Sequence, residues 1–470
     1  MGHVRKLQEV QSPVLLEDIF PYSIPPRILL EDVVSETVGG KTFQVDLSQV
    51  ASRELVITDT TFRDGQQART PYTIDQVAHL YELMSRLAGP NGVIRQTEFF
   101  VYTKKDRLAV DCCRDLGLRY PEITGWIRAE IGDLQLIKEM KLAETGLLTS
   151  CSDYHIFLKL HLDRKRAMDK YLGVVKEALA NGIRPRCHLE DITRADLYGF
   201  VVPFVQELMR LSEGLPDDKK VKIRLCDTMG FGLSYPTAAI PRSIPKLVLL
   251  MIHECGVPGA NLEWHGHNDF HKVLINATTA WIYGCNALNA TLIGIGERTG
   301  NPPLEAAIME YIGLKGEMNG IDTRVITEIA EYYRSIGTRI SVRYPLVGDN
   351  FHKTAAGIHA GGLMADERIY NIFDTGKLLN RPPEVAITDK SGSDGVALWV
   401  NNFLGFHGKD RIRKSKLAKV MRWVADEYDL HGRTTLISDK ELIEQVRKHL
   451  PEEYKAAEAA GRLTMTHHEE

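Results

Sequence analysis

Three residues whose side chains favour metal ions stand at the ends of two apolar segments. The segment 57–67 (ITDTTFRDGQQ) is predicted to be a strand followed by the pair Arg63-Asp64. His265 and His267 end a second predicted strand, and alternate residues of a strand point to one face. The two imidazoles can therefore bind one metal ion, with Asp64 as a third ligand. Two histidines and a carboxylate leave coordination positions open, as catalysis at a metal requires.

Either motif by itself has a more ordinary interpretation. A single HxH pair in a strand is more often two partly buried histidines than a metal site. An Arg-Asp pair after a strand is more often a turn with a local ion pair. The order of the elements between the two motifs is what favours the metal site.

Short apolar strands and longer amphipathic helices alternate along this part of the chain. Strands are expected near 55–60, 95–101, 122–127, 145–151, 184–190, 221–227, 260–266 and 287–294. Helices are expected near 75–87, 104–116, 131–143, 164–181, 198–213, 241–255, 269–284 and 303–314. Strand–helix units of this number and size predict an α/β fold of the (β/α)8 TIM-barrel type. A doubly wound open sheet is the competing arrangement, but no expected strand is followed by a GxGxxG turn.

Polar residues concentrate at the expected carboxyl ends of these strands, which is where a TIM barrel carries its chemistry. They are Arg63, Asp64, Glu98, Arg128, Ser152, Glu190, Asp227, Thr228, His265, His267 and Glu297. Buried charges without a ligand would cost desolvation energy, so packing alone does not explain them. A barrel that holds only a structural metal is therefore disfavoured.

The composition excludes several classes of protein. The chain has 470 residues, a net charge of -4 and a pI near 6.5, which give no reason to expect a nucleic-acid partner. Its cysteines show no CxxC pairing and are expected to be reduced thiols of a cytoplasmic protein. We expect neither a signal peptide nor a membrane span, because no stretch approaches the ~20 apolar residues that a span needs.

Six segments, in order along the chain, resemble the motifs of the DRE-TIM metallolyases. They are DTTFRDGQQ (59–67), EDITR (190–194), CDTMG (226–230), HGHND (265–269), GIGERTGN (294–301) and GIHAGG (357–362). The likeness is to the Claisen-condensing branch of that family, which includes homocitrate synthase, 2-isopropylmalate synthase and, most similar of all, the Re-type citrate synthases. The resemblance implies a TIM barrel followed by small helical subdomains, in a homodimer.

The resemblance also implies an acyltransferase that joins the methyl carbon of acetyl-CoA to the ketone of a 2-oxo acid. A metal at Asp64, His265 and His267 would hold two oxygens of the 2-oxo acid and polarise its ketone. Arg63 would stabilise the alkoxide that develops there. We expect Mn²⁺ or Mg²⁺, and Zn²⁺ stays open.

Three further barrel residues resemble parts of the family's active site. Thr228 and Arg194 resemble residues that bind substrate carboxylates, although Arg194 could instead pair with a nearby aspartate. Glu190 matches a strand-end glutamate of the active site, with the alternative that it is a buried carboxylate that orders Arg63. The family commonly has a glutamate where this chain has Gln66, so the charge partner of Arg63 is in doubt.

The resemblance supplies a base for the acetyl methyl group outside the barrel. His359 lies in the motif GIHAGG, and Tyr370 follows eleven residues later. In homocitrate synthases a histidine and a tyrosine at this spacing act with a barrel glutamate and reach in from the neighbouring subunit. Glu297 and Glu190 are both candidates for the glutamate. Taken alone, His359 would be a helix-start residue and Tyr370 ordinary core.

The expected substrate follows from the strand ends that would line the pocket. Phe99 and Phe100 are adjacent, so one of them must point inward and shorten the pocket. Trp126 adds bulk, and Arg128 offers a cation for a second carboxylate. A short pocket with an extra cation favours oxaloacetate, with citrate as the product. Homocitrate synthase is the alternative.

The sequence also bears on other activities and on the domain organisation. 2-Isopropylmalate synthase activity is less favoured, because the chain is too short for the accessory and regulatory domains of the leucine-inhibited enzymes. A lyase like hydroxymethylglutaryl-CoA lyase is the least favoured of these activities. Such lyases carry a reactive cysteine in the loop after strand eight, and the loop 294–303 has no cysteine. We expect an arm or cap at 1–50, the catalytic barrel at 51–318 and helical subdomains at 319–470.

Overall fold

Eight parallel strands close into a barrel in the computed structural model, which describes residues 7–464. They are β3 (Val56–Asp59), β4 (Ile94–Phe100), β5 (Glu122–Arg128), β6 (Glu144–Ser150), β7 (Arg184–Glu190), β8 (Lys222–Asp227), β9 (Leu262–Gly266) and β10 (Ala287–Ala290). Each strand pairs with the next, and β10 pairs with β3 to complete the ring. The predicted TIM barrel is confirmed.

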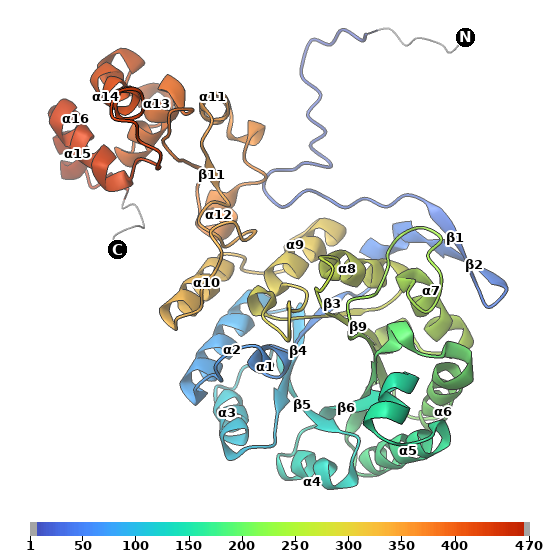
Figure 1. Cartoon of the computed structure of the whole chain (residues 1–470). Helices are drawn as coiled ribbons and strands as arrows, with labels where there is room; N and C mark the ends of the chain where they lie inside the picture. Colours follow the sequence, from blue (N-terminus) through green and yellow to red (C-terminus); the bar gives the residue numbers. More distant parts are fainter. Residues whose placement is uncertain (1–6, 465–470) are drawn as a thin grey trace. The chain divides into compact units, whose positions relative to one another are not determined.

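Helices cover the outside of this barrel (Figure 1). They are α2 (Ile74–Ala88), α3 (Lys104–Asp115), α4 (Ile131–Glu139), α5 (Arg164–Ala180), α6 (Val202–Leu211), α7 (Ile244–Leu249), α8 (Val273–Tyr283) and α9 (Leu304–Lys315). A short helix, α1 (Asp64–Gln67), directly follows the first barrel strand. Three π-helical turns accompany this set, at Tyr154–Lys159, Leu197–Val201 and Leu250–Glu254.

Local signals explain where several of these helices begin. Thr73 caps α2, and its side chain and that of Gln76 bond reciprocally to the backbone as a capping box. Thr103 and Asp106 do the same for α3. The apolar faces of the helices then pack on the outward side chains of the strands. Leu189 is one of these outward side chains and is fully buried.

The chain divides into two compact units. One contains the barrel and spans Ile24–Tyr332 with the described residues before Pro21; the other spans 333–464 and includes Pro21–Ser23. An antiparallel hairpin of β1 (Val33–Val38) and β2 (Lys41–Asp46) precedes the barrel strands within the first unit. The helix α10 (Val325–Ser335) contains the boundary.

The second unit is mainly helical and has its own apolar core. Its helices are α11 (Gly357–Ala365), α12 (Thr375–Leu379), α13 (Gly392–Phe403), α14 (Ala418–Asp429), α15 (Asp439–His449) and α16 (Pro451–Ala459). Two short parallel strands, β11 (Lys353–Thr354) and β12 (Glu384–Val385), join them. Leu404, Leu417 and Val446 are among the buried residues of this core.

Charged side chains fill the middle of the barrel. On the inward face, the guanidinium of Arg224 lies between Glu98, at 3.0 Å, and Glu263, at 2.9 Å. Arg186 contacts the same two carboxylates at 3.4 and 3.3 Å. All four side chains are essentially inaccessible to water. A buried charge is tolerable only when it is paired, so these residues depend on one another.

A second set of charges lies nearer the amino-terminal ends of the strands. Lys222 donates to Glu144 at 2.9 Å and to Gln96 at 3.0 Å. Burial would raise the pKa of Glu144, but the charges of Lys222 and Arg186 overcome it and lower that pKa to about 2. The stabilisation from Glu144 is therefore complete above its unfolded pKa near 4.5 and is lost as the pH falls towards 2.

Two simpler expectations can be compared with the structure directly. The cysteines at 112, 113, 151, 187, 226, 255 and 285 are free thiols, and all but Cys112 are buried. Within residues 7–464, no helix has both the length and the apolar character needed to cross a bilayer.

Candidate metal centre

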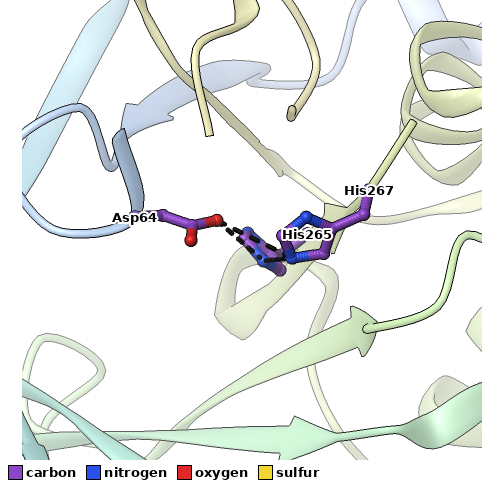
Figure 2. Close-up of side chains that lie close together, drawn as sticks. All are labelled: Asp64, His265 and His267. Atoms are coloured by element: carbon purple, nitrogen blue, oxygen red, sulfur yellow. Dashed lines mark hydrogen bonds and ion pairs between the residues drawn. The ribbon is translucent and has the colours of Figure 1, made fainter. Parts of the chain in front are cut away.

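The predicted ligand triad converges at the carboxyl end of the barrel. His265 lies within β9, His267 follows it, and Asp64 begins α1 after β3. Nε2 of each histidine is 3.7 Å from Oδ2 of Asp64, and the two Nε2 atoms are 3.3 Å apart (Figure 2). All three side chains are buried. The structure therefore confirms that these residues form one group able to hold a metal ion.

The polar atoms of this group suit a divalent cation. Nδ1 of His265 is 2.7 Å from Oδ1 of Asn289, so the imidazole can donate there and leave Nε2 with a free lone pair. Burial lowers the pKa of His265 to about 3, which keeps the ring neutral. Oδ2 of Asp64 is buried and has no hydrogen-bond partner among the described residues. A buried carboxylate oxygen with no other partner, beside two neutral imidazoles, fits a divalent metal ion.

Arg63 lies beside the triad and is held from two sides. Its Nη1 is 3.6 Å from Asp64, and its Nε is 3.2 Å from Glu98, a residue of β4. The guanidinium carbon also lies 5.3 Å from the ring centroid of Trp126. Gln66, at the position where we expected a charge partner to be missing, donates instead to a backbone carbonyl. Glu98 is thus the carboxylate that positions Arg63 from the barrel interior.

An aromatic cluster surrounds Trp126 of β5, with rings from β4 and from the turn after it. The ring of Phe100 packs edge-on against Trp126 at 5.5 Å, and that of Tyr102 does so at 6.4 Å. Phe99 points the other way and stacks on Phe62 at 4.9 Å. Phe100 therefore lies on the same face of β4 as the inward-pointing Glu98, and Phe99 lies on the opposite face. Nε1 of Trp126 is buried and has no hydrogen-bond partner among the described residues.

Glu190 lies at the end of β7 within a polar cluster. Its carboxylate is 2.9 Å from Nδ1 of His155 and 3.1 Å from Nζ of Lys159, and it accepts from Ser150. Burial would raise the pKa of Glu190, but these partners lower it to about 2. Glu190 is therefore ionised and fully paired at neutral pH. Its predicted catalytic role stays a prediction.

The remaining predicted barrel residues already have protein partners. Arg194 donates to Asp191 at 3.0 and 3.1 Å, which is the local pairing we weighed for it, and its guanidinium lies 4.2 Å over Tyr154. Thr228 accepts a hydrogen bond from the backbone nitrogen of Asp191 at 2.9 Å. Both residues stay candidates for substrate binding.

Arg128 and Glu297 lie at more open positions. Arg128 forms a bidentate pair with Asp133 at 2.8 and 2.9 Å. Glu297 is exposed on the loop after β10, where its neighbour Arg298 donates to Asp269 at 2.8 Å and so joins this loop to the one after β9. The proposed roles of Arg128 and Glu297 stay predictions.

His359 and Tyr370 come together within the second unit. Their ring centroids are 4.2 Å apart, and Nδ1 of His359 is 3.2 Å from Oγ1 of Thr354. His359 lies in the first turn of α11, as a glycine-rich helix start would place it. The pair predicted from the motif and its spacing is therefore in contact.

Several residues of the site were not assigned a role from the sequence. Glu98 was noted only as a strand-end charge, and Asn289, His155 and Lys159 were not singled out. Asn289 could have been found, since it lies in an expected strand beside the HxH strand. His155 and Lys159 lie in a π-helical turn, for which the sequence has no clear signal.

Comparison with known proteins matches this chain to one family. The model of the HMGL-like family matches residues 54–332. A protein of Syntrophus aciditrophicus named citrate (Re)-synthase is 54% identical over 97% of this chain and 72% of its own length. The Clostridium kluyveri protein of the same name is 48% identical over 95% and 96%. A 2-phosphinomethylmalate synthase of Streptomyces hygroscopicus is 35% identical over 94% and 98%. With its barrel, its metal triad and these matches, the chain belongs to the HMGL-like family.

Proposed function

We propose that this protein is a Re-type citrate synthase, which condenses acetyl-CoA with oxaloacetate and water to give citrate and CoA. The observation that carries the proposal is the 54% identity to a citrate (Re)-synthase over 97% of the chain. The buried Asp64, His265 and His267 triad supports it, because the condensation needs a polarised ketone. Homocitrate synthase remains the alternative, since a protein of that name is 27% identical over 76% of this chain.

The barrel residues supply binding and electrostatic stabilisation. A divalent cation held by Asp64, His265 and His267 would act as a Lewis acid on the ketone of the 2-oxo acid. Arg63 faces the same place and would stabilise the negative charge that develops on the ketone oxygen. Glu98 fixes the Arg63 side chain, so this charge need not reorganise during the reaction. We propose Mn²⁺ or Mg²⁺ as the ion, because a carboxylate and open positions for oxygen ligands suit them.

The second unit would supply proton transfer. We propose that His359, in contact with Tyr370, removes the proton from the acetyl methyl group, and that the pair acts on the barrel of a partner copy in a homodimer. Arg194, Thr228 and Arg128 are proposed to recognise the substrate carboxylates. The free thiols fit a cytoplasmic location, which we also propose.

The function is tested by CoA release from acetyl-CoA in the presence of Mn²⁺. Oxaloacetate, 2-oxoglutarate, 2-oxoisovalerate and pyruvate are compared, each with and without a chelator. Chelator-sensitive release with oxaloacetate alone supports the proposal. A preference for 2-oxoglutarate would establish the homocitrate alternative, and no release with any of the four would reject a synthase for these substrates.

Trp126→Phe is expected to relax the choice of 2-oxo acid. The smaller ring removes part of the aromatic cluster beside Arg63, and 2-oxoglutarate is one methylene longer than oxaloacetate. One methylene changes selectivity by roughly 10- to 200-fold, so we expect the ratio of kcat/KM for 2-oxoglutarate over oxaloacetate to rise about tenfold. Trp423→Phe, at a half-buried tryptophan that packs against the core of the second unit, is the matched control and should leave the ratio unchanged. An unchanged ratio in Trp126→Phe would show that Trp126 does not line the substrate pocket.

His359→Ala is expected to keep metal binding and lose condensation, by about 10²- to 10⁴-fold for a lost acid–base group. Mixing it with Asp64→Ala subunits should restore part of the activity, because a mixed dimer has one site with both residues intact. The measurement is CoA release after subunit exchange, with each variant alone as the baseline. If mixing restores nothing although the subunits exchange, each site is built from a single chain.

A further inference from the structure

A π-helical turn brings two basic side chains onto Glu190. The turn Tyr154–Lys159 follows β6 and carries His155 and Lys159 on the side that faces β7. π-Helical turns are rare and occur frequently at functional sites. Ile156 of the turn is buried, but Tyr154, Phe157 and Leu158 are exposed, so apolar packing accounts for only one side chain of the turn.

The register of the barrel places this cluster level with the metal triad. Ser150 of β6 is paired with Glu190 of β7, which is paired with Cys226 of β8, which in turn is paired with His265 of β9. These four residues therefore form one layer at the carboxyl end of the barrel. Neighbouring strands are about 4.8 Å apart, so the Glu190 backbone is only about 10 Å from that of His265. The cluster faces the same opening as the metal site.

The geometry of His155 is that of an imidazole oriented by a carboxylate. Its Nδ1 is 2.9 Å from Oε2 of Glu190, at hydrogen-bond distance. Its Nε2 has Asp191 as a charged neighbour, but at 3.7 Å the carboxylate is beyond hydrogen-bond distance. Asp191 is itself occupied by Arg194 and Ser152. Nδ1 also lies 3.4 Å from Nζ of Lys159, but the contact with Glu190 is shorter and favours Nδ1 as the donor. Nε2 then carries the lone pair, and a side chain that is 16% exposed can reach a substrate or a water molecule.

The proposed reaction has a second proton-transfer task that needs a base of its own. Condensation leaves citrate joined to CoA as a thioester, and a water molecule must then cleave that bond. Glu190 is a poor base for this step, because its partners lower its pKa to about 2 and a carboxylate that holds protons so weakly accepts one reluctantly. The imidazole of His155 lies beside it, and histidine is the side chain that most often serves as a general base in enzymes.

We infer that His155, oriented by Glu190, is the catalytic residue that activates water for hydrolysis of the citryl thioester; the inference rests on the proposed synthase function. The water oxygen bonds to the thioester carbonyl carbon as Nε2 of His155 takes its proton. The tetrahedral adduct then collapses, the carbon–sulfur bond breaks, and its electron pair leaves with sulfur. The imidazolium returns the proton to the CoA thiolate, so atoms and charge balance. Lys159 supports the step by holding the Glu190 carboxylate in place.

Two substitutions test the roles of the two nitrogen atoms of His155 separately. His155→Asn keeps a donor near the position of Nδ1, for Glu190, and removes the base at Nε2. His155→Gln places its amide nearer Nε2 and provides no base. With acetyl-CoA and oxaloacetate, rapid chemical quench and mass spectrometry follow citryl-CoA, and a thiol reagent follows free CoA. Both variants should form citryl-CoA in a burst while CoA release slows by about 10²-fold or more.

The controls separate this step from folding and from the proposed function. His161→Asn is the matched control, since His161 is exposed in the following loop and has a positive φ of 53° that asparagine tolerates. Mn²⁺ binding and thermal unfolding of each variant show whether the barrel is intact. Unchanged CoA release in both folded variants, or equal loss of condensation and hydrolysis without citryl-CoA, overturns the inference. Failure of the unaltered protein to release CoA with oxaloacetate would reject the proposed function instead.

Discussion

Replacing His265 with alanine is expected to abolish metal binding and turnover together. The residue is one of the three side chains of the triad that would hold the metal ion, and its Nε2 lies 3.7 Å from Oδ2 of Asp64. Loss of the Lewis acid removes several kcal/mol of stabilisation from the transition state, so activity should fall by about 10³-fold or more. Mn²⁺ binding is measured by electron paramagnetic resonance, and CoA release in parallel with it.

A surface histidine gives the control for this prediction. His253 is exposed and stacks on Phe43 of the hairpin, away from the strand ends that hold the triad, so His253→Ala should leave both measurements unchanged. If His265→Ala kept normal turnover, the metal assignment would be wrong. If it kept metal binding but lost turnover, His265 would act on the substrate and not as a ligand.

Arg224→Leu is expected to destabilise the barrel strongly. The substitution leaves Glu98 and Glu263 as buried carboxylates that have lost one shared partner. Removing one member of a buried ion pair costs about 3–5 kcal/mol. We expect that decrease in the free energy of unfolding of the barrel unit, measured by urea denaturation and followed by circular dichroism.

An exposed arginine shows how much of this effect comes from burial. Arg210 pairs with Glu207 at 2.5 Å on the surface of α6, and Arg210→Leu should cost no more than about 1 kcal/mol. Equal losses for the two variants would mean that the interior charges are hydrated. Adding Glu263→Gln to Arg224→Leu should recover part of the stability, because it removes one of the two buried carboxylates that lost their contact with Arg224.

Most of the barrel could be predicted because its strands are short, apolar on one face and separated by amphipathic helices. The strand expected at 184–190 matches β7, and the others differ from the structure by a few residues at their ends. The longest difference is at β10, which ends at Ala290 although the apolar pattern continues to 294. There the chain turns into a 3₁₀ turn with Ile293 at a positive φ of 55°. Hydrophobicity alone does not signal such a turn.

The charged interior could not be predicted from the same pattern. In β7 the alternating residues Arg186, His188 and Glu190 looked like polar positions of a strand, without a sign that they point inward. Their partners lie on other strands, far away in the sequence. The metal triad could be predicted because two of its members are only two residues apart in the sequence. The pairing of Arg63 with Glu98 could not be predicted, because Glu98 lies on a different strand. It takes the place of the carboxylate that the family commonly has where this chain has Gln66.

The charged interior also bears on how the barrel is assembled during synthesis. Thr58 in the first barrel strand contacts Glu263 in the seventh, 205 residues later. Glu98 is likewise synthesised before its partners Arg186 and Arg224. While the chain leaves the ribosome, these side chains stay hydrated, because burying them alone would cost more than collapse gains. The early strands therefore resist premature compaction and aggregation, and the ring closes when its last partners arrive.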